Sequence, residues 1–227
     1  MKVFSLIALI FINFSFAEVY FEDDFSDGDD DGWIKSSSAG FLVTNGEYNI
    51  FAGGLRGQGL ALNGDNSGIM SVSDYSIRCV LRIECGLEAG VVARYIASDD
   101  WYYQVVFQPA SGRIVLERTK LLEPTMTLDE YFLPIALNEE YFVRFQVSGD
   151  LIQSKIWQGA TEDEPSEWHM EADDSVQANP GSFGLFAGGY GKERVPWSSV
   201  FDNVLVTAPI EQNLTQKTWA SIKFLVW

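Results

Sequence analysis

The side chains that most often carry out catalysis are few in this sequence. His169 is the single histidine, and it lies in the polar stretch 167–170 with no Gly-x-Ser-x-Gly motif nearby. A nucleophile activated by histidine therefore has little support. The two cysteines, Cys79 and Cys85, together with one histidine also exclude a zinc ribbon and a zinc site built from several histidines. Any metal that this chain binds should have oxygen ligands.

Carboxylates are plentiful and are crowded into one short segment. Asp27, Asp29 and Asp31, followed by Gly32, match the start of a calcium loop, in which alternating carboxylates surround a hard cation. The match ends there, because Ser38 stands where such a loop carries a bidentate glutamate. The same residues are typical of a well-solvated turn, so both interpretations stay open.

A second set of residues has the chemistry of a sugar-binding face. Sugar rings stack on flat aromatic side chains, and their hydroxyls bond to forked polar groups such as those of Arg and Gln. Arg94 interrupts the apolar run 91–96, where a charged side chain either pairs with a buried acid or lines a ligand cleft. The other candidates are polar and aromatic residues whose positions along the predicted strands place their side chains on an outer face. The predicted ligand-binding set is Arg94, Tyr103, Gln104, Arg144, Lys155 and Trp157.

These residues fall in segments whose hydrophobic pattern has a period of two, as expected of strands with one buried face. The pattern predicts strands at 41–44, 47–51, 77–83, 89–96, 101–107, 113–118, 141–147, 151–157, 182–187 and 199–206. Turn sequences such as Asn45-Gly46 and Gly149-Asp150 separate them. Without a long helical pattern before the C-terminal tail, we expect an all-β fold, a two-sheet antiparallel jelly-roll sandwich. A concave outer face of such a sandwich would hold the ligand.

The length and charge of the chain limit its organisation and its partners. Its 227 residues suit one large β-domain. There are 15 Lys and Arg against 32 Asp and Glu, which gives a net charge of −17. That charge argues against nucleic acid and anionic lipid as partners, and it leaves cations and neutral ligands.

The two ends differ in character from the predicted domain, residues 18–208. Lys2, the apolar run 3–16 and a small residue at Ala17 predict a secretory signal peptide at 1–17, with an uncleaved anchor as the alternative. The protein should then be secreted, with no membrane span after removal of the signal. In the tail, residues 209–227, Trp219, Ile222 and Val226 recur at helical spacing, which predicts a short amphipathic helix. This tail could bind a cell-surface or sorting partner, or simply dock on the domain.

Cys79 lies in the predicted strand 77–83, and Cys85 lies two residues beyond its end in the same extended segment. Six positions along a strand separate Cys79 from Cys85 by about 20 Å, which is too far for a disulfide. We expect two free thiols.

Several short motifs, taken together and in order, resemble one superfamily. They are Glu-Asp-Asp-Phe-Ser-Asp-Gly at 22–28, Asp-Gly-Trp at 31–33, Asn-Gly-Glu-Tyr at 45–48, Ala-Arg-Tyr at 93–95, Trp-Tyr-Tyr at 101–103, Gly-Arg-Ile at 112–114, Phe-Gly-Leu at 183–185 and Phe-Asp-Asn-Val at 201–204. From about residue 20 to 207 the chain resembles the concanavalin A-like lectin/glucanase superfamily. Within it, the chain looks like the laminin-G-like and 3-keto-disaccharide-hydrolase-type jelly rolls of secreted bacterial proteins.

The resemblance implies a structural calcium ion that ties the first strand to the last. Its ligands would be the carboxylate of Asp24, the backbone carbonyl of Gly46 and the carboxylate of Asp202. The residues agree, because an unpaired Asp202 between apolar neighbours would be costly to bury. Pairing of Asp202 with an arginine is the alternative.

The superfamily includes lectins, glycanases and adhesion modules, so the resemblance by itself leaves the function open. Its retaining glucanases carry Glu-x-Asp-x-Glu on one strand, and neither 162–165 nor 84–88 reproduces that motif. We therefore expect a secreted, calcium-stabilised, lectin-like module that binds glycan on its concave sheet without catalysis. One alternative is a glycoside hydrolase or lyase acting on a modified sugar, with acids from separate strands such as Glu117 with Asp99 or Asp100. The other is a non-catalytic adhesion or structural module.

Overall fold

The computed structural model describes residues 17–36, 39–53, 57–63, 71–176, 178–189 and 195–210. The predicted signal peptide lies outside these residues, apart from its last position, and so does the predicted helix of the tail. Within the described ranges, no helix has the length and apolar character needed to cross a membrane.

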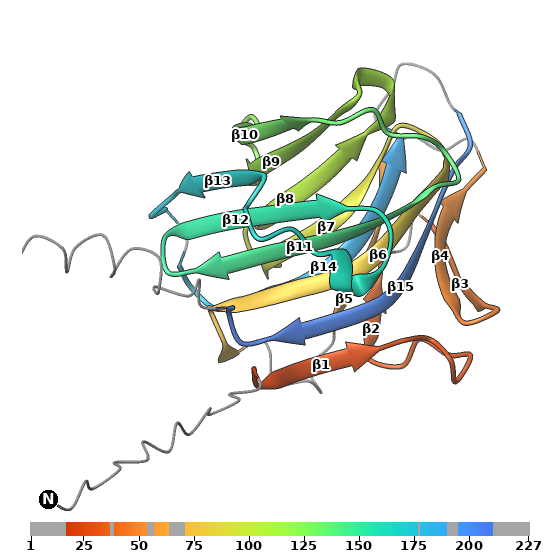
Figure 1. The fold of residues 1–227 in the computed structure, drawn as a ribbon, viewed down its shortest axis with the longest axis horizontal. Helices are drawn as coiled ribbons and strands as arrows, with labels where there is room; N and C mark the ends of the chain where they lie inside the picture. The colour runs from red at the N-terminus through yellow and green to blue at the C-terminus, as the bar shows by residue number, and fades with distance from the viewer. Residues whose placement is uncertain are drawn as a thin grey trace, which may run out of the picture.

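The described chain forms two antiparallel sheets that pack face to face (Figure 1). The eight-stranded sheet has the order β13 (Met170–Asp173), β12 (Leu151–Trp157), β11 (Glu140–Ser148), β6 (Tyr75–Cys85), β15 (Trp197–Thr207), β4 (Glu47–Ala52) and β3 (Gly40–Thr44), and β1 (Val19–Asp23) also pairs with β15. The seven-stranded sheet has the order β10 (Met126–Phe132), β9 (Arg113–Thr119), β8 (Trp101–Gln108), β7 (Glu88–Ile96), β14 (Ser182–Gly189), β5 (Gly57–Asn63) and β2 (Trp33–Lys35). Two short 3-10 helices, η3 (Pro109–Ser111) and η4 (Thr161–Asp163), lie in connecting loops.

Alternation along the strands creates the core between the two sheets. On β6, Ile77 and Leu81 are almost fully buried, while Arg78 and Arg82 lie on the other side of the strand. The seven-stranded sheet contributes inward side chains such as Val105, which is completely buried. Each such side chain stabilises the fold by about 1.5–3 kcal/mol relative to an exposed position. The residues on the outer faces are therefore held on a rigid support.

The predicted all-β jelly roll is confirmed. Every strand predicted from the period-two pattern is present, with its ends moved by a residue or two at most. The turn at Asn45 and Gly46 has the positive φ angles, 55° and 77°, that an Asn-Gly hairpin turn requires. The pattern did not identify β1, β2, β5, β10 and β13, which are short or lie toward the edges of the sheets.

Both cysteines lie on β6 and are free, as the spacing predicted. Cys79 is buried in the core, and this burial raises the pKa of its thiol. A buried thiol of this kind behaves as a small apolar side chain.

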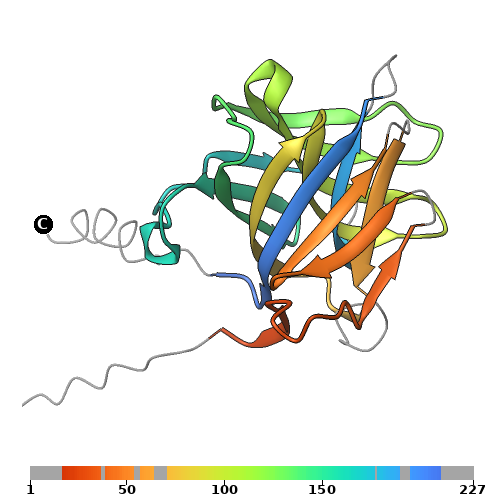
Figure 2. The same ribbon diagram turned by 90° about the vertical axis from the view of Figure 1, so that its right-hand side faces the viewer.

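The first and last strands meet beside each other (Figure 2). β15 pairs with β4 through Phe201 and then, beyond a bulge at Asp202 and Asn203, pairs with β1. The bulge, where Asn203 has a φ of 51°, is the point at which the strand changes partner. Asp202 lies near enough to Glu47, at the start of β4, for their charges to interact.

Candidate functional site

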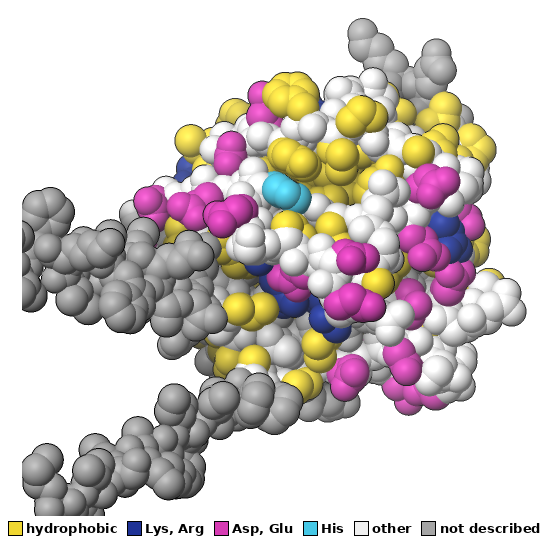
Figure 3. Space-filling model, viewed as in Figure 1, with side chains coloured by type: hydrophobic (Ala, Val, Ile, Leu, Met, Phe, Trp, Pro, Cys, Tyr) yellow, Lys and Arg dark blue, Asp and Glu magenta, His cyan; other side chains and the backbone are white. Residues whose placement is uncertain are grey.

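The outer surface of the eight-stranded sheet, which we call the polar face, carries polar and aromatic side chains in cross-strand rows. Because alternate residues of each strand point into the core, their neighbours must point outward. The antiparallel register then places side by side Arg82 with Glu140, Val80 with Phe142 and Trp157, and Arg78 with Arg144 and Lys155. Figure 3 shows this face, with Lys and Arg side chains near its middle and many Asp and Glu side chains around them.

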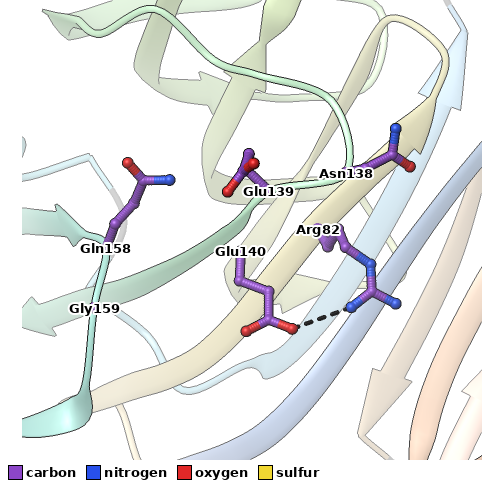
Figure 4. Close-up of a pocket in the computed structure, with 6 residues that line it drawn as sticks. All are labelled: Arg82, Asn138, Glu139, Glu140, Gln158 and Gly159. Atoms are coloured by element: carbon purple, nitrogen blue, oxygen red, sulfur yellow. Dashed lines mark hydrogen bonds and ion pairs between the residues drawn. The ribbon is translucent and has the colours of Figure 1, made fainter.

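A pocket of about 490 Å³ opens at the end of the polar face where β11 begins and β12 ends. Its lining consists of Arg82, Asn138, Glu139, Glu140, Gln158 and Gly159 (Figure 4). The side-chain amides of Asn138 and Gln158 make no hydrogen bond within the part of the chain that the structure describes. Each of them can therefore donate to and accept from a bound molecule.

Arg82 is held in a fixed position at the edge of this pocket. Its guanidinium donates to both carboxylate oxygens of Glu47, at 2.9 and 2.8 Å, and to Glu140 at 3.2 Å. The hydrogen bonds that Arg82 donates to Glu47 raise the pKa of Arg82, which stays charged. The pocket therefore combines a fixed cation, carboxylates and free amides.

An aromatic pair lies in the next row of the polar face. The rings of Phe142 and Trp157 stack with centroids 5.2 Å apart. The indole N–H of Trp157 donates to the carbonyl of Ala160 at 2.9 Å, and the side chain is only 7% exposed. Trp157 therefore ties the end of β12 to the residues that follow it, and it offers little free ring surface.

The loop of residues 158–169, which we call the covering loop, lies over the predicted ligand residues Arg144 and Lys155. Glu164 of this loop accepts two hydrogen bonds from Arg144, both at 2.7 Å, and its carboxylate is 3.3 Å from the ammonium of Lys155. Lys155 also donates to the carbonyl of Pro165 at 2.7 Å and lies 4.6 Å from the ring centre of Trp168. Arg144 and Lys155 are therefore buried against the chain's own loop.

The pKa of Glu164 reflects this arrangement. Burial alone would raise it, but the hydrogen bonds and charges of Arg144 and Lys155 outweigh burial and hold the pKa below the ordinary glutamate value. The loop is thus closed by a carboxylate that remains ionised in mildly acidic solution.

The structure does not bring the six predicted ligand-binding residues to one surface. Arg144, Lys155 and Trp157 lie together on the polar face, whereas Gln104 lies on the outer face of the seven-stranded sheet. Tyr103 is in the core, where its hydroxyl donates to the carbonyl of Asp174 at 3.2 Å.

Arg94 is completely buried and pairs with an acid, which was one of the two alternatives for this residue; it does not line a ligand cleft. Its guanidinium donates to the carbonyl of Ser73 at 2.8 Å and to the carboxylate of Asp74 at 3.0 Å. Its backbone has a φ of 52° at a bulge of β7, and its N–H donates to the hydroxyl of Tyr75 at 2.7 Å. These contacts give Arg94 a structural role.

Two carboxylates lie on the outer face of the seven-stranded sheet, on either side of β8. Glu117 accepts from the amide of Gln104 at 2.9 Å, and Glu88 accepts from Gln108 at 3.1 Å. Burial raises the pKa of both acids, and the charge of Glu117 raises that of Glu88 further. The buried side-chain oxygen of Gln104 has no hydrogen-bond partner among the described residues.

Two of the three residues of the expected calcium site, Asp24 and Asp202, lie near enough to each other to interact electrostatically. Burial raises the pKa of Asp202, and the negative charges of Glu47, Asp24 and Glu140 raise it further. The carboxylate of Asp202 accepts hydrogen bonds from its neighbour Asn203, and Asp24 accepts one from the backbone of Ser26 at 3.0 Å. Among the described residues, no group of three or more His, Cys, Asp and Glu side chains is placed to hold a metal. The expected site is smaller, with two carboxylates and the carbonyl of Gly46.

The aspartates at 27–31 bind their own loop. Asp27 accepts from the backbone of Asp29 at 3.3 Å, and Asp29 accepts from the backbone of Asp31 at 3.0 Å. These contacts are those of turn-forming aspartates, the second of the two interpretations.

The pocket residues Arg82, Asn138, Glu140 and Gln158 were not among the predicted site residues. Arg82 stands out in the sequence only as an outward position of β6, and the other three lie at strand ends. Their proximity depends on the register of β6 with β11, which places Arg82 opposite Glu140. No signal in the sequence gives that register.

Comparison with solved structures decides the fold. Carbohydrate-binding module CBM66 from Bacillus subtilis matches with a TM-score of 0.61 and 18% identity, over 78% of this chain and 96% of that one. The chain has the concanavalin A-like jelly-roll fold. The exoplasmic/lumenal domain of VIP36, in its Ca²⁺/Man3GlcNAc-bound form, matches this jelly roll with a TM-score of 0.57 and 12% identity, over 86% of this chain and 91% of that one.

A third similar jelly roll is domain 4 of AbnA, a GH43 extracellular arabinanase from Geobacillus stearothermophilus, in complex with arabinotriose. It matches with a TM-score of 0.56 and 11% identity, over 85% of this chain and 93% of that one. No protein-family model matches the sequence, and a comparison with curated proteins finds no match. At these identities the likeness establishes the fold and not the function.

Proposed function

We propose that this jelly roll is a secreted carbohydrate-binding module whose glycan site is the pocket on the polar face. The observation that carries the proposal is the lining of that pocket, in which Arg82, held by Glu47, and Glu140 lie beside the unpaired amides of Asn138 and Gln158. Such groups match the hydroxyls of a sugar, which both donate and accept hydrogen bonds. The carbohydrate-bound and carbohydrate-binding structures of the same fold support the class of ligand. Secretion rests on the predicted signal peptide.

A glycan array with purified protein tests this proposal. We expect at least one neutral or singly charged glycan to bind, and we expect Gln158→Ala to weaken that binding about fivefold, because one hydrogen bond to a sugar hydroxyl contributes about 1 kcal/mol. Gln108→Ala, the same change on the opposite sheet, is the control. Loss of binding in Gln108→Ala but not in Gln158→Ala would move the site to the seven-stranded sheet, and an empty array would favour an adhesion module.

We further propose that Asp24, Gly46 and Asp202 hold a structural calcium ion. The supporting observation is the crowding of negative charge around Asp202, which a divalent cation would relieve. Because the bulge at Asp202 is where β15 leaves β4 and joins β1, an ion there would join three strands.

Calcium should raise the melting temperature by about 5 °C or more when its concentration is about a hundred times the dissociation constant. EDTA should reverse this shift, and Asp202→Asn should abolish it. Asp173→Asn on exposed β13 is the matched control and should keep the full shift. Equal shifts in both variants, or no shift in the wild type, would contradict the calcium site.

Hydrolysis of a glycan that binds instead on the outer face of the seven-stranded sheet, opposite the pocket, is a second candidate function, to which Glu88 and Glu117 point. Burial raises the pKa of both acids, which is the direction that a general acid requires. We expect any release of reducing sugar from an array-positive polysaccharide to fall at least a hundredfold in Glu117→Gln. The same activity in wild type and variant, or none in either, would exclude this pair.

A further inference from the structure

The row Arg78, Arg144 and Lys155 places three cations next to one another across β6, β11 and β12. One carboxylate, that of Glu164, pairs with Arg144 and Lys155. Glu22 on β1 is near enough to act electrostatically on Arg78. Adjacent strands lie about 4.8 Å apart, so the sheet itself keeps these charges together. Three cations and two carboxylates leave one positive charge in excess.

Arg78 is the member of this row with no bound acceptor in the described chain. It makes neither a hydrogen bond nor an ion pair with any residue that the structure describes, although its guanidinium carries five donors. The side chain is partly buried. Burial and the charge of Arg144 lower the pKa of Arg78 in spite of Glu164 and Glu22. A guanidinium that has lost water without gaining an acceptor gains from a bound anion.

We propose that Arg78 binds the acidic group, a carboxylate or sulfate ester, of a charged sugar unit. Arg144 and Lys155 lie beside it on the next two strands and add to the local positive potential. The inference rests on the proposed function, because it names the chemical class of the glycan. A planar guanidinium matches the paired oxygens of such a group better than a lysine does.

The position of Arg78 agrees with a glycan that also enters the pocket. Arg78 and Arg82 point to the same side of β6 and lie four residues apart, which is about 13 Å along a strand. The Phe142–Trp157 row lies between them. A short oligosaccharide could therefore place a neutral unit in the pocket and an acidic unit at Arg78.

The net charge of −17 restricts this ligand to one with isolated acidic groups. At physiological salt, charges interact over about 8 Å. A single acidic group at Arg78 is therefore attracted by the three cations of the row, while the repulsion from more distant carboxylates is screened. A continuous polyanion would extend over the surrounding acidic surface and be repelled.

Titration calorimetry with a matched pair of ligands tests the proposal. The probes are a xylo-oligosaccharide bearing one glucuronic acid and the same oligosaccharide after reduction of its carboxyl group. We expect the acidic form to bind at least tenfold more tightly, and this preference should vanish in Arg78→Gln and be partly kept in Arg78→Lys. Arg113→Gln, on the opposite sheet, should keep the whole preference. An unchanged melting temperature in Arg78→Gln shows that the variant is folded.

Three other results would contradict the inference, and they can be told apart. Equal binding of both probes, unchanged in Arg78→Gln, leaves a carbohydrate module without an anion site at Arg78. Free glucuronate or sulfate that binds as tightly as the acidic oligosaccharide shows a site for small anions, not for a glycan. If neither probe binds but the glycan array has other hits, only the inference about Arg78 is wrong. If neither probe binds and the array is also empty, the proposed carbohydrate-binding function is wrong as well.

Discussion

Glu164→Gln should lower the free energy of unfolding by about 3 kcal/mol, because it leaves Arg144 charged and buried without a carboxylate. Arg144 is only 5% exposed and donates two hydrogen bonds of 2.7 Å to Glu164. Lys155 loses the same counter-charge. Glu162→Gln makes the same chemical change at an exposed position of the same loop and should cost little. Urea unfolding at neutral pH measures both variants.

The effect of Glu164→Gln should depend on pH with a definite sign. The folded-state pKa of Glu164 is lowered, so its contribution is complete above the unfolded value of 4.5 and is lost as the pH falls through the lower folded value. The gap in stability between wild type and Glu164→Gln should therefore be largest near neutral pH and should narrow below about pH 4. A gap that stays constant down to about pH 3 would show that the carboxylate charge does not hold the covering loop.

Gly90→Ala should destabilise the domain by about 3 kcal/mol or more, because the added methyl group would overlap the backbone of the next strand. A Cβ atom at Gly90 would overlap the carbonyl oxygen of Val105 and lie 2.9 Å from the ring of Phe186. The first contact is with backbone, so relief requires β7 to separate from β8.

Gly53→Ala is the matched control for Gly90→Ala. No atom lies within 4 Å of a Cβ built at Gly53, and its backbone needs no positive φ. Thermal unfolding should therefore show a fall of roughly 5–10 °C for Gly90→Ala and almost none for Gly53→Ala. Similar melting temperatures for the two variants would contradict the close approach of β7 and β8.

The fold could be predicted from local patterns because burial imposes a period of two on every strand that covers the core. β6 and β11 are long and alternate clearly, so their limits follow from the residues. The missed strands lack that signal for physical reasons. β10 is mostly exposed on both sides, β5 contains two glycines, and β2 has only three residues. The short β1 has no fully buried residue.

The candidate site was harder to predict because it depends on register and on a loop. Strand parity identified Arg144, Lys155 and Trp157 as outward residues of neighbouring strands, and the structure places them together. The alternation along the strands could not reveal that the covering loop pairs Glu164 with Arg144 and Lys155. For Arg94, parity failed because a bulge in β7 with a positive φ turns the side chain inward.

The pairing of β1 with β15 has a mechanical consequence. Val19 lies opposite Thr207, and the N–H of Ala208 donates to the carbonyl of Glu18 at 2.8 Å, so the chain enters and leaves the domain side by side. A force that pulled these two points apart would load the hydrogen bonds of this strand pair one at a time, beginning at Glu18. The strand pair should therefore separate at low force, one hydrogen bond after another. An ion bound at Asp24 and Asp202 would lie at the far end of this pair, where it would oppose further separation of the strands.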